Sequence, residues 1–252
     1  MYEECPSYEL PSKEQKIWRY MDFTKFMSML DKKEIYFTRA DKFTDKFEGT
    51  FPKANRELRQ LTFQRILSPE EQEMLFTKQD EMFEYNRGFV TINCWHMNDY
   101  ESAAMWDLYL KSSEGVAIQS NVGKLIESFA HCPEKIRFGK VKYKDFKKEP
   151  IEIDDILIDM FVYKRKSFEH EREIRAIHKI PFIYAEEGWI KDEVESPVKH
   201  GLGISCDISV LIEKVYISPT APSWFEELVR SMCDKFNLND RVVKSELSEL
   251  PY

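Results

Sequence analysis

Residues 171–175, Glu-Arg-Glu-Ile-Arg, place charged side chains at alternate positions at the start of an apolar run. Side chains two residues apart in a β-strand lie on the same face of the sheet. A strand here therefore presents Glu171, Glu173 and Arg175 together, while Ile174 covers the other face. Such a face serves either as a binding or catalytic surface or as a structural network of ion pairs, and both interpretations stay open at this point.

The composition limits the classes of protein that the chain can belong to. With 252 residues, 42% of them hydrophobic and 14% aromatic, the chain can bury a core as one domain. It has only 8 glycines and neither a GxGxxG nor a GxxxxGK[ST] motif, which leaves Rossmann and P-loop nucleotide sites without support. The net charge of -8 argues against broad attraction to nucleic acid, although a local patch could still bind it.

Cysteine and histidine spacing indicates a reduced chain without a metal centre. The five cysteines are dispersed, odd in number and lack a CxxC pair, as in cytosolic proteins. The five histidines show no HxxxH or HExxH spacing, so we expect no metal. No signal pattern and no apolar stretch of about 18 residues occurs. We therefore expect a cytoplasmic protein with no membrane contact.

Hydrophobic periodicity predicts strands and helices that alternate irregularly along the chain. Strands are predicted at 16–21, 34–38, 88–95, 115–119, 137–143, 171–180, 215–217 and 241–244. Helices are predicted at 23–30, 53–66, 69–85 and 154–166. Two further helices are predicted from their capping residues, one capped by Asn98 and Glu101 and the other by Ser223 and Glu226. The expected fold is one α+β domain over residues 1–252, with a mixed, mainly antiparallel sheet of about seven strands. Residues 53–86 form a helical insertion, whose second helix begins at the capping box of Ser68 and Glu71.

Arg19 lies inside the apolar run from Ile17 to Met21. A buried guanidinium without an anion costs several kcal/mol, so Arg19 requires a partner. That partner is Glu173 or Asp45 in a structural ion pair, or a phosphate of a ligand.

Two further groups of side chains have both a binding and a structural interpretation. Thr91 and Asn93 share one face of the strand at 88–95 and can offer hydroxyl and amide groups to a ligand, but threonine is also a common strand residue. Trp106 and Tyr109 can stack on a base or on nicotinamide, although aromatic residues at helical spacing usually belong to a core.

Several segments, taken in order, resemble the bacterial family called domain of unknown function 2971, over about residues 16–220. These segments are IWRYMDF, KFMSML, EIYFTRADKFTDKFEG, FVTINCW, AAMWDLY, GVAI and FEHEREIR. This chain departs from the family pattern at Lys46, where proline is usual, and at Trp95, where phenylalanine is common. The family name implies no activity.

The order of these parts is also similar to that of the ADP-ribosyltransferase superfamily. That similarity implies that Arg19 holds NAD, that Thr91 takes the hydroxyl position, and that Glu173 is the catalytic carboxylate, with Glu171 as its helper. The middle segment Thr91-Ile92-Asn93 stands where a Ser-Thr-Ser type motif would be expected. The residues expected to contact NAD or another nucleotide are Arg19, Tyr20, Tyr36, Thr91, Asn93, Trp106, Tyr109 and Arg175.

The leading hypothesis is therefore an enzyme that cleaves NAD and transfers ADP-ribose to an unknown macromolecular acceptor or to water, in a bacterial defence or toxin context such as phage defence. One alternative is a metal-dependent nuclease that uses Asp45 or Asp155 with Glu173. Another is a non-catalytic sensor or protein-interaction module, in which Arg19 pairs with the acidic strand.

Overall fold

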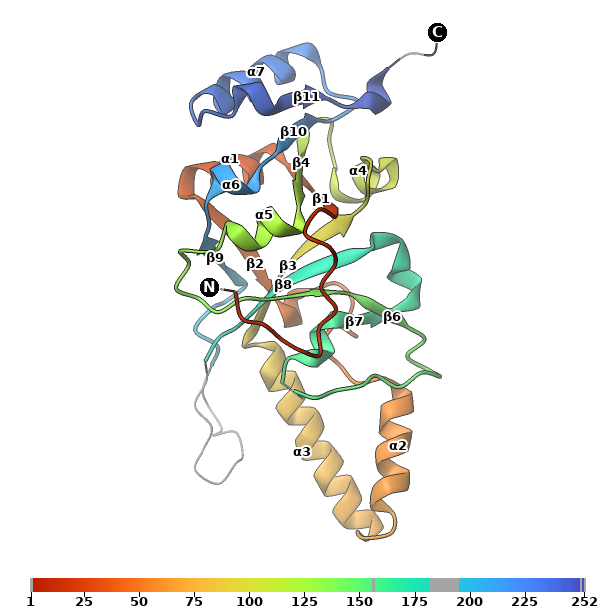
Figure 1. The fold of residues 1–252 in the computed structure, drawn as a ribbon. Coiled ribbons are helices and arrows are strands. Elements are labelled where there is room, and N and C mark those ends of the chain that lie inside the picture. Colours follow the sequence, from red (N-terminus) through yellow and green to blue (C-terminus); the bar gives the residue numbers. More distant parts are fainter. Residues whose placement is uncertain (1, 156, 182–194, 250, 252) are drawn as a thin grey trace.

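A computed structural model describes residues 2–155, 157–181, 195–249 and 251. Its main sheet confirms the mixed, mainly antiparallel α+β class, with nine strands in place of the expected seven. These strands are β1 (Lys16–Asp22), β2 (Glu34–Arg39), β3 (Val90–Met97), β4 (Gly115–Asn121), β5 (Arg137–Lys140), β8 (Glu173–Lys179), β9 (Gly201–Ser205), β10 (Lys214–Ile217) and β11 (Val242–Lys244) (Figure 1). β10 and β11 form its parallel pair.

Strand β3 organises the sheet, because both of its edges carry other strands. Along one edge β3 pairs with β8 from Val90 to His96. The other edge is divided: β1 pairs with its end at His96 and Met97, and β2 pairs with its beginning at Thr91 and Ile92. The edge between these two pairings faces a gap where β1 and β2 diverge.

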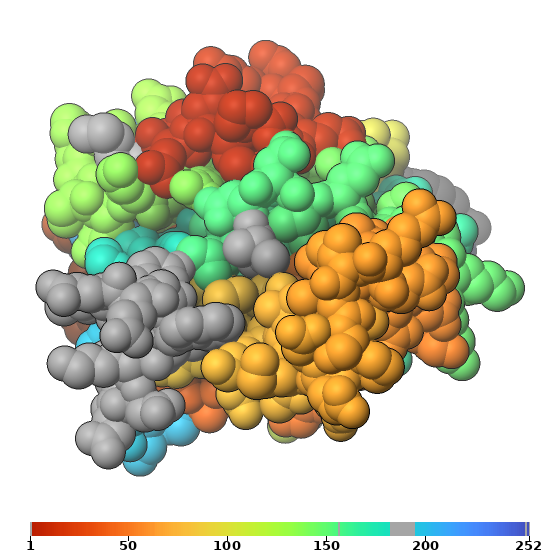
Figure 2. All heavy atoms as spheres, turned by 90° about the horizontal axis from the view of Figure 1, so that it is seen from below, coloured from red at the N-terminus to blue at the C-terminus, as the bar shows by residue number. Residues whose placement is uncertain are grey.

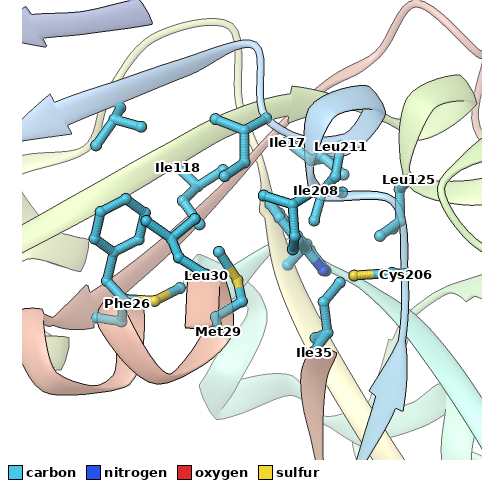
Figure 3. Packing of buried hydrophobic residues seen from close by; sticks show 14 of the residues in the cluster. Ile17, Phe26, Met29, Leu30, Ile35, Ile118, Leu125, Cys206, Ile208 and Leu211 are labelled. Carbon is cyan, nitrogen blue, oxygen red and sulfur yellow. The ribbon is translucent and has the colours of Figure 1, made fainter. Parts of the chain in front are cut away.

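One face of the sheet carries the larger hydrophobic core (Figure 3). It is covered by α1 (Phe23–Lys32), α5 (Val122–Glu127), α6 (Ile208–Leu211) and α7 (Ser223–Asp234). Alternation along β1 directs Ile17 and Met21 into this core, where they meet residues such as Phe26 and Leu30 of α1. Each fully buried side chain of this kind stabilises the fold by about 1.5–3 kcal/mol.

The opposite face carries aromatic side chains, short elements and the charged residues. Trp18 and Tyr20 of β1 point to this face and pack with Trp106 of α4 (Ala103–Tyr109); the rings of Tyr20 and Trp106 are 5.0 Å apart. Beside them lies a small parallel sheet of β6 (Lys142–Lys144) and β7 (Tyr163–Arg165), with the 3-10 helices η2 (Asp159–Val162) and η3 (Lys166–Glu171).

The helices α2 (Lys53–Phe63) and α3 (Pro69–Arg87) form a hairpin that extends away from the sheet (Figure 1) and forms much of one end of the molecule (Figure 2). The predicted capping box is present, because Ser68 accepts from the amide of Glu71 and the Glu71 carboxylate accepts from that of Ser68. At the base of the hairpin Phe83 is buried and its ring lies 4.6 Å from that of Phe51.

The helix predicted at 154–166 is wrong. The carboxylate of Asp159 accepts hydrogen bonds from the backbone amides of Asp154 and Asp155, both at 2.9 Å, which favours a turn in place of a helix. Residues 163–165 then extend and pair with β6. Tertiary pairing therefore overrides the helical spacing of the apolar residues.

Two predicted helix caps are also wrong. Helix α4 begins at Ala103, with Ser102 accepting from the amide of Met105, and not at Asn98. Pro222 precedes α7, and Ser223 makes no capping hydrogen bond there. The carboxylate of Glu226 instead forms ion pairs with Arg230 and Lys244. It therefore does not bond to the backbone amides at the start of the helix.

Among the helices that the structure describes, none combines the length and the apolar character needed to cross a membrane.

Candidate functional site

Five charged side chains gather on the face that also carries Trp18. This charge cluster consists of Glu48, Lys164, Glu171, Glu173 and Arg175, each with a side chain no more than 10% exposed. Glu173 and Arg175 come from β8, Lys164 from β7, Glu171 from the end of η3, and Glu48 from the loop after β2. Four separate parts of the chain therefore build one buried ionic site.

Arg175 is the most enclosed member of the charge cluster, with an exposure of 0%. Its guanidinium donates to both carboxylate oxygens of Glu48, at 2.8 and 3.0 Å, and to Oε2 of Glu173 at 2.7 Å. Gly49 follows with a φ of 67°, and a side chain at this position would collide with the ring of Phe161. The Glu-Gly step thus lets the loop bring Glu48 against Arg175.

Lys164 joins the remaining carboxylates. Its ammonium lies 2.5 Å from Glu171 Oε2 and 3.0 Å from Glu173 Oε1. Burial opposes the ammonium charge, but the negative charges of Glu173 and Glu48 outweigh burial and raise the pKa of Lys164. The cationic partner of Glu171 is therefore Lys164, whereas Arg175 pairs with Glu173 and Glu48.

Charge balance separates the roles of the two acidic residues. The charge cluster has three carboxyl groups and two cations, so one proton makes it neutral. Burial, followed by the hydrogen bond and the charge of Glu173, raises the pKa of Glu171 to about 8. Burial also opposes ionisation of Glu173, but the charge of Arg175 outweighs it and lowers the pKa of Glu173. The shared proton therefore belongs to Glu171, and Glu173 remains ionised.

Glu171 reaches the charge cluster by a different route from the one expected. Strand β8 begins at Glu173, and Arg172 before it has a left-handed conformation with φ 42° and ψ 55°. Simple alternation of a strand over 171–175 is thus wrong at its first residue. The turn at Arg172 and the end of η3 nevertheless bring Glu171 to the same ammonium as Glu173.

Arg19 has neither of the carboxylate partners expected for it. Its guanidinium donates to the Cys94 carbonyl at 2.7 Å, at the gap between β1 and β2, and lies 6.0 Å from the ring centroid of Trp95. Asp45 binds Arg165 instead, at 2.8 Å. Among the described residues no carboxylate forms an ion pair with Arg19, and burial lowers its pKa.

Tyr109, at the end of α4, connects Arg19 with the acidic residues electrostatically. Although 46% of the residue is exposed, burial of its hydroxyl end, followed by the charges of Glu173, Cys94 and Glu171, raises its pKa. Burial lowers the pKa of Arg19, and the neighbouring Cys94 and Tyr109 partly offset this effect. Tyr109 is therefore close enough to the two glutamates to be influenced by them and close enough to Arg19 to influence it, whereas neither glutamate is among the groups that shift the pKa of Arg19.

The structure does not bring Thr91 and Asn93 together with Glu173. In the pairing of β3 with β8, Thr91 is opposite His178 and Asn93 is opposite Ala176, whereas Glu173 is opposite His96. Because alternate residues point to opposite faces, Thr91 and Asn93 lie on the other side of the sheet from Glu173. The Thr91 hydroxyl donates to His178 O at 3.3 Å, and the Asn93 amide donates to Tyr36 O at 2.9 Å.

Three other predicted contact residues occupy different environments. Tyr20 is 5% exposed and its hydroxyl accepts from the Ser102 amide at 2.7 Å. Trp106 is 3% exposed and its indole N–H donates to Glu101 at 2.9 Å. Tyr36, by contrast, is 48% exposed on β2. Tyr20 and Trp106 therefore act as packed residues beside the charge cluster.

His96 is a site residue that the sequence pattern did not single out. It lies directly opposite Glu173, and its Nδ1 is 2.7 Å from Glu171 O. A carbonyl only accepts, so Nδ1 carries the hydrogen and Nε2 has a lone pair. Nε2 is buried and has no hydrogen-bond partner among the described residues. Burial lowers the pKa of His96. Lys164 and Glu48 were likewise not among the predicted site residues, since only the fold brings them to β8.

The residues named for a metal-dependent alternative lie in separate ion pairs. Asp45 binds Arg165, and Asp155 binds Arg137 at 3.2 Å. Within the described ranges, no group of three or more His, Cys, Asp or Glu side chains is arranged to hold a metal ion.

The fold and the charge cluster define an α+β protein with a buried, proton-sharing pair of glutamates, and with an arginine at Cys94 O that has no carboxylate partner among the described residues. A model of the family described as "Protein of unknown function (DUF2971)" matches residues 105–176. The matched segment contains Tyr109, Lys164, Glu171, Glu173 and Arg175, so it covers most of the site and supports the family resemblance there. A search of curated proteins found no match to the chain.

Proposed function

We propose that the protein cleaves the bond between nicotinamide and ribose in NAD and transfers the ADP-ribosyl group to a macromolecular acceptor or to water. Two observations carry this proposal: Arg19 has no carboxylate partner among the described residues, and Tyr109 lies near enough to be influenced by both glutamates and to influence Arg19. An anion-binding guanidinium without a carboxylate partner and a carboxyl pair able to exchange a proton meet the two main requirements of this reaction.

The reaction needs stabilisation of positive charge and removal of one proton. As the C1′–N bond breaks, its electron pair goes to nicotinamide, which leaves as a neutral molecule, and the ribose develops oxocarbenium character. An ionised carboxylate favours this charge, as in glycoside cleavage. The acceptor then forms a bond to C1′ and loses a proton to a base.

The charge cluster suits different residues to these tasks. Glu173 stays ionised between Arg175 and Lys164 and supplies negative potential. Glu171 has the raised pKa and, in its ionised form, takes the proton of the acceptor. Arg19 holds the pyrophosphate of NAD through its guanidinium. Thr91 and Asn93 have no part in this assignment, because on the opposite face of the sheet their side chains already bond to His178 O and Tyr36 O. Arg19 leaves β1 toward that face as well, but its guanidinium reaches the Cys94 carbonyl at the gap between β1 and β2.

A direct test measures nicotinamide release from NAD by chromatography, with and without protein and nucleic-acid extracts as acceptors. Arg19→Met and Glu171→Gln are expected to lower the rate by about 100-fold or more. Glu57→Gln is a matched control, because Glu57 is an exposed carboxylate on α2, in an ion pair with Lys53. Labelled NAD shows whether ADP-ribose is attached to an acceptor or released.

Absence of nicotinamide release from the wild-type protein under all acceptor conditions, at the level of Glu171→Gln, would refute the proposal. The charge cluster would then be a structural network, as in the non-catalytic alternative. Magnesium-dependent degradation of DNA or RNA by the same preparation would instead support the nuclease alternative.

A further inference from the structure

A groove of about 850 Å³ lies on the same face of the sheet as the charge cluster but shares no residue with it. Its floor includes Trp18 of β1, Gln119 of β4 and Tyr216 of β10. The pairings of the sheet place His96 opposite Trp18, Trp18 opposite Gln119, and Gln119 opposite Lys214. We call this hollow the Gln119 groove. Gln119 lies on β4, which is the second strand from β3 across the sheet, with β1 between them.

The Gln119 side chain is a polar group without a partner. The residue is only 6% exposed, and no described residue hydrogen-bonds with its amide group. Its backbone carbonyl is occupied, because it accepts from the amide of Glu213 at 3.0 Å. The side-chain amide atoms of Gln119 are not among the fully buried atoms that lack a partner, so they face the groove, where they are available to bond a ligand.

The charges around the Gln119 groove favour a cation. Its lining contains six carboxylates and four cationic side chains. Lys124 is already paired with Glu213 at 2.7 Å, and the guanidinium of Arg241 donates to backbone carbonyls. Asp99, Glu127, Asp240 and Glu246 have no ion-pair partner among the described residues, and neither do Lys16 and Lys214, so the lining as a whole has two more carboxylates than cations. Exposed charges of this kind each contribute at most about 1 kcal/mol, but together they select the sign of the ligand.

The apolar part of the lining suits an aliphatic chain. Val210, Ile212 and Val243 line the groove together with the aromatic residues of the floor. A flexible alkyl chain covers such a surface while its charged end makes hydrogen bonds. Gln119 Oε1 accepts from N–H groups, and a guanidinium presents several of them in a planar arrangement.

We propose that the Gln119 groove binds an alkyl guanidinium, whose N–H groups donate to Gln119 Oε1 and whose charge is balanced by the carboxylates around the groove. This chemistry is shared by a free diamine derivative and by an arginine side chain of a protein partner. The site is separate from the proposed NAD reaction, and its occupancy does not depend on that reaction.

The experiment titrates the full chain with agmatine and, separately, with a short glycine-flanked arginine peptide, by calorimetry and by NMR of the side-chain amides. Saturable binding below about 10 mM is expected, with a shift of the Gln119 amide signal and weaker binding as salt rises. Tighter binding of agmatine identifies a small-molecule source, and tighter binding of the peptide identifies a protein source.

Gln119→Leu is expected to weaken binding by about tenfold, because it removes the acceptor but keeps an aliphatic side chain. Gln119→Glu is expected to tighten binding, because it adds a carboxylate at the same place; this second variant keeps the test decisive if the first does not fold. Gln60→Leu, at an exposed position of α2, is the matched control. The proposal is overturned if neither cation saturates, if Gln119→Leu binds like wild type, or if adenosine monophosphate binds in place of agmatine.

Discussion

Arg175 of β8 and Glu48 of the loop after β2 form a bidentate ion pair at 2.8 and 3.0 Å, although 127 positions separate them in the chain. The side chains are 0% and 1% exposed. This contact physically links the acidic strand to the Asp-x-Phe-Glu-Gly segment. The joint occurrence of these two motifs in one sequence thus has a structural reason.

Removal of Glu48 should destabilise the fold strongly. Glu48→Gln leaves the buried guanidinium of Arg175 with only Glu173 as a carboxylate partner, and we expect a loss of about 3 kcal/mol in the free energy of unfolding. Urea denaturation monitored by tryptophan fluorescence measures this loss. Glu57→Gln, in an exposed ion pair, should change stability by less than about 0.5 kcal/mol, and equal effects of the two variants would contradict a buried role for Glu48.

The proton on Glu171 should appear in the dependence of stability on pH. The pKa of Glu171 is about 8 in the folded protein and near 4.5 in the unfolded chain. Between these two pH values the folded protein therefore binds more protons than the unfolded chain. The contribution of Glu171 to stability is therefore complete below pH 4.5 and is lost as pH rises through about 8. Glu171→Gln, which mimics the protonated form, should become more stable relative to wild type by about 1–3 kcal/mol over this range. A constant difference between the two proteins across pH would contradict this assignment.

Arg19 should affect activity much more than stability. Burial lowers its pKa, and it lacks a carboxylate partner among the described residues, so its charge opposes folding and does not stabilise the fold. Arg19→Met should change the free energy of unfolding by no more than about 1 kcal/mol, from the lost hydrogen bond to Cys94 and the contact with Trp95. The same variant should lose NAD cleavage. Paired denaturation and nicotinamide assays test this, and a large loss of stability would indicate a structural role.

His96 should become protonated only at a lower pH than an exposed histidine. Burial lowers its pKa, and the hydrogen bond to Glu171 O requires hydrogen on Nδ1. A nitrogen-15 NMR titration of the imidazole is expected to show the Nδ1–H tautomer and a midpoint below 6.5. The exposed residues His131 and His170 provide internal comparisons in the same spectrum. A neutral imidazole with its hydrogen on Nε2 would show that this hydrogen bond is not made, and a midpoint above 6.5 would show that burial does not dominate the pKa of His96.

Much of the secondary structure follows from local sequence patterns. The strands around Ile17, Ile35 and Ile92 were predicted because their apolar residues alternate or cluster, and the start of α3 because Ser68 and Glu71 satisfy the free amides of a helix end. The segment around Asp159 was predicted wrongly. Its side chain caps two backbone amides, and the following residues gain hydrogen bonds to β6, which no local spacing reveals.

By itself, the sequence determined that this chain folds as an α+β domain, because its apolar residues recur every second residue in some segments and about every fourth in others. It also determined that Glu173 and Arg175 share one face of a strand, because they are two residues apart. Only the tertiary structure decided which charges meet. Lys164 and Glu48 reach β8 from other parts of the chain, and Glu171 enters through a turn. Arg19 has no carboxylate partner in the part of the chain that the structure describes. Pairing across the sheet and burial set these outcomes, since the strength and the sign of an electrostatic interaction depend on distance and solvent exposure, which sequence spacing does not specify.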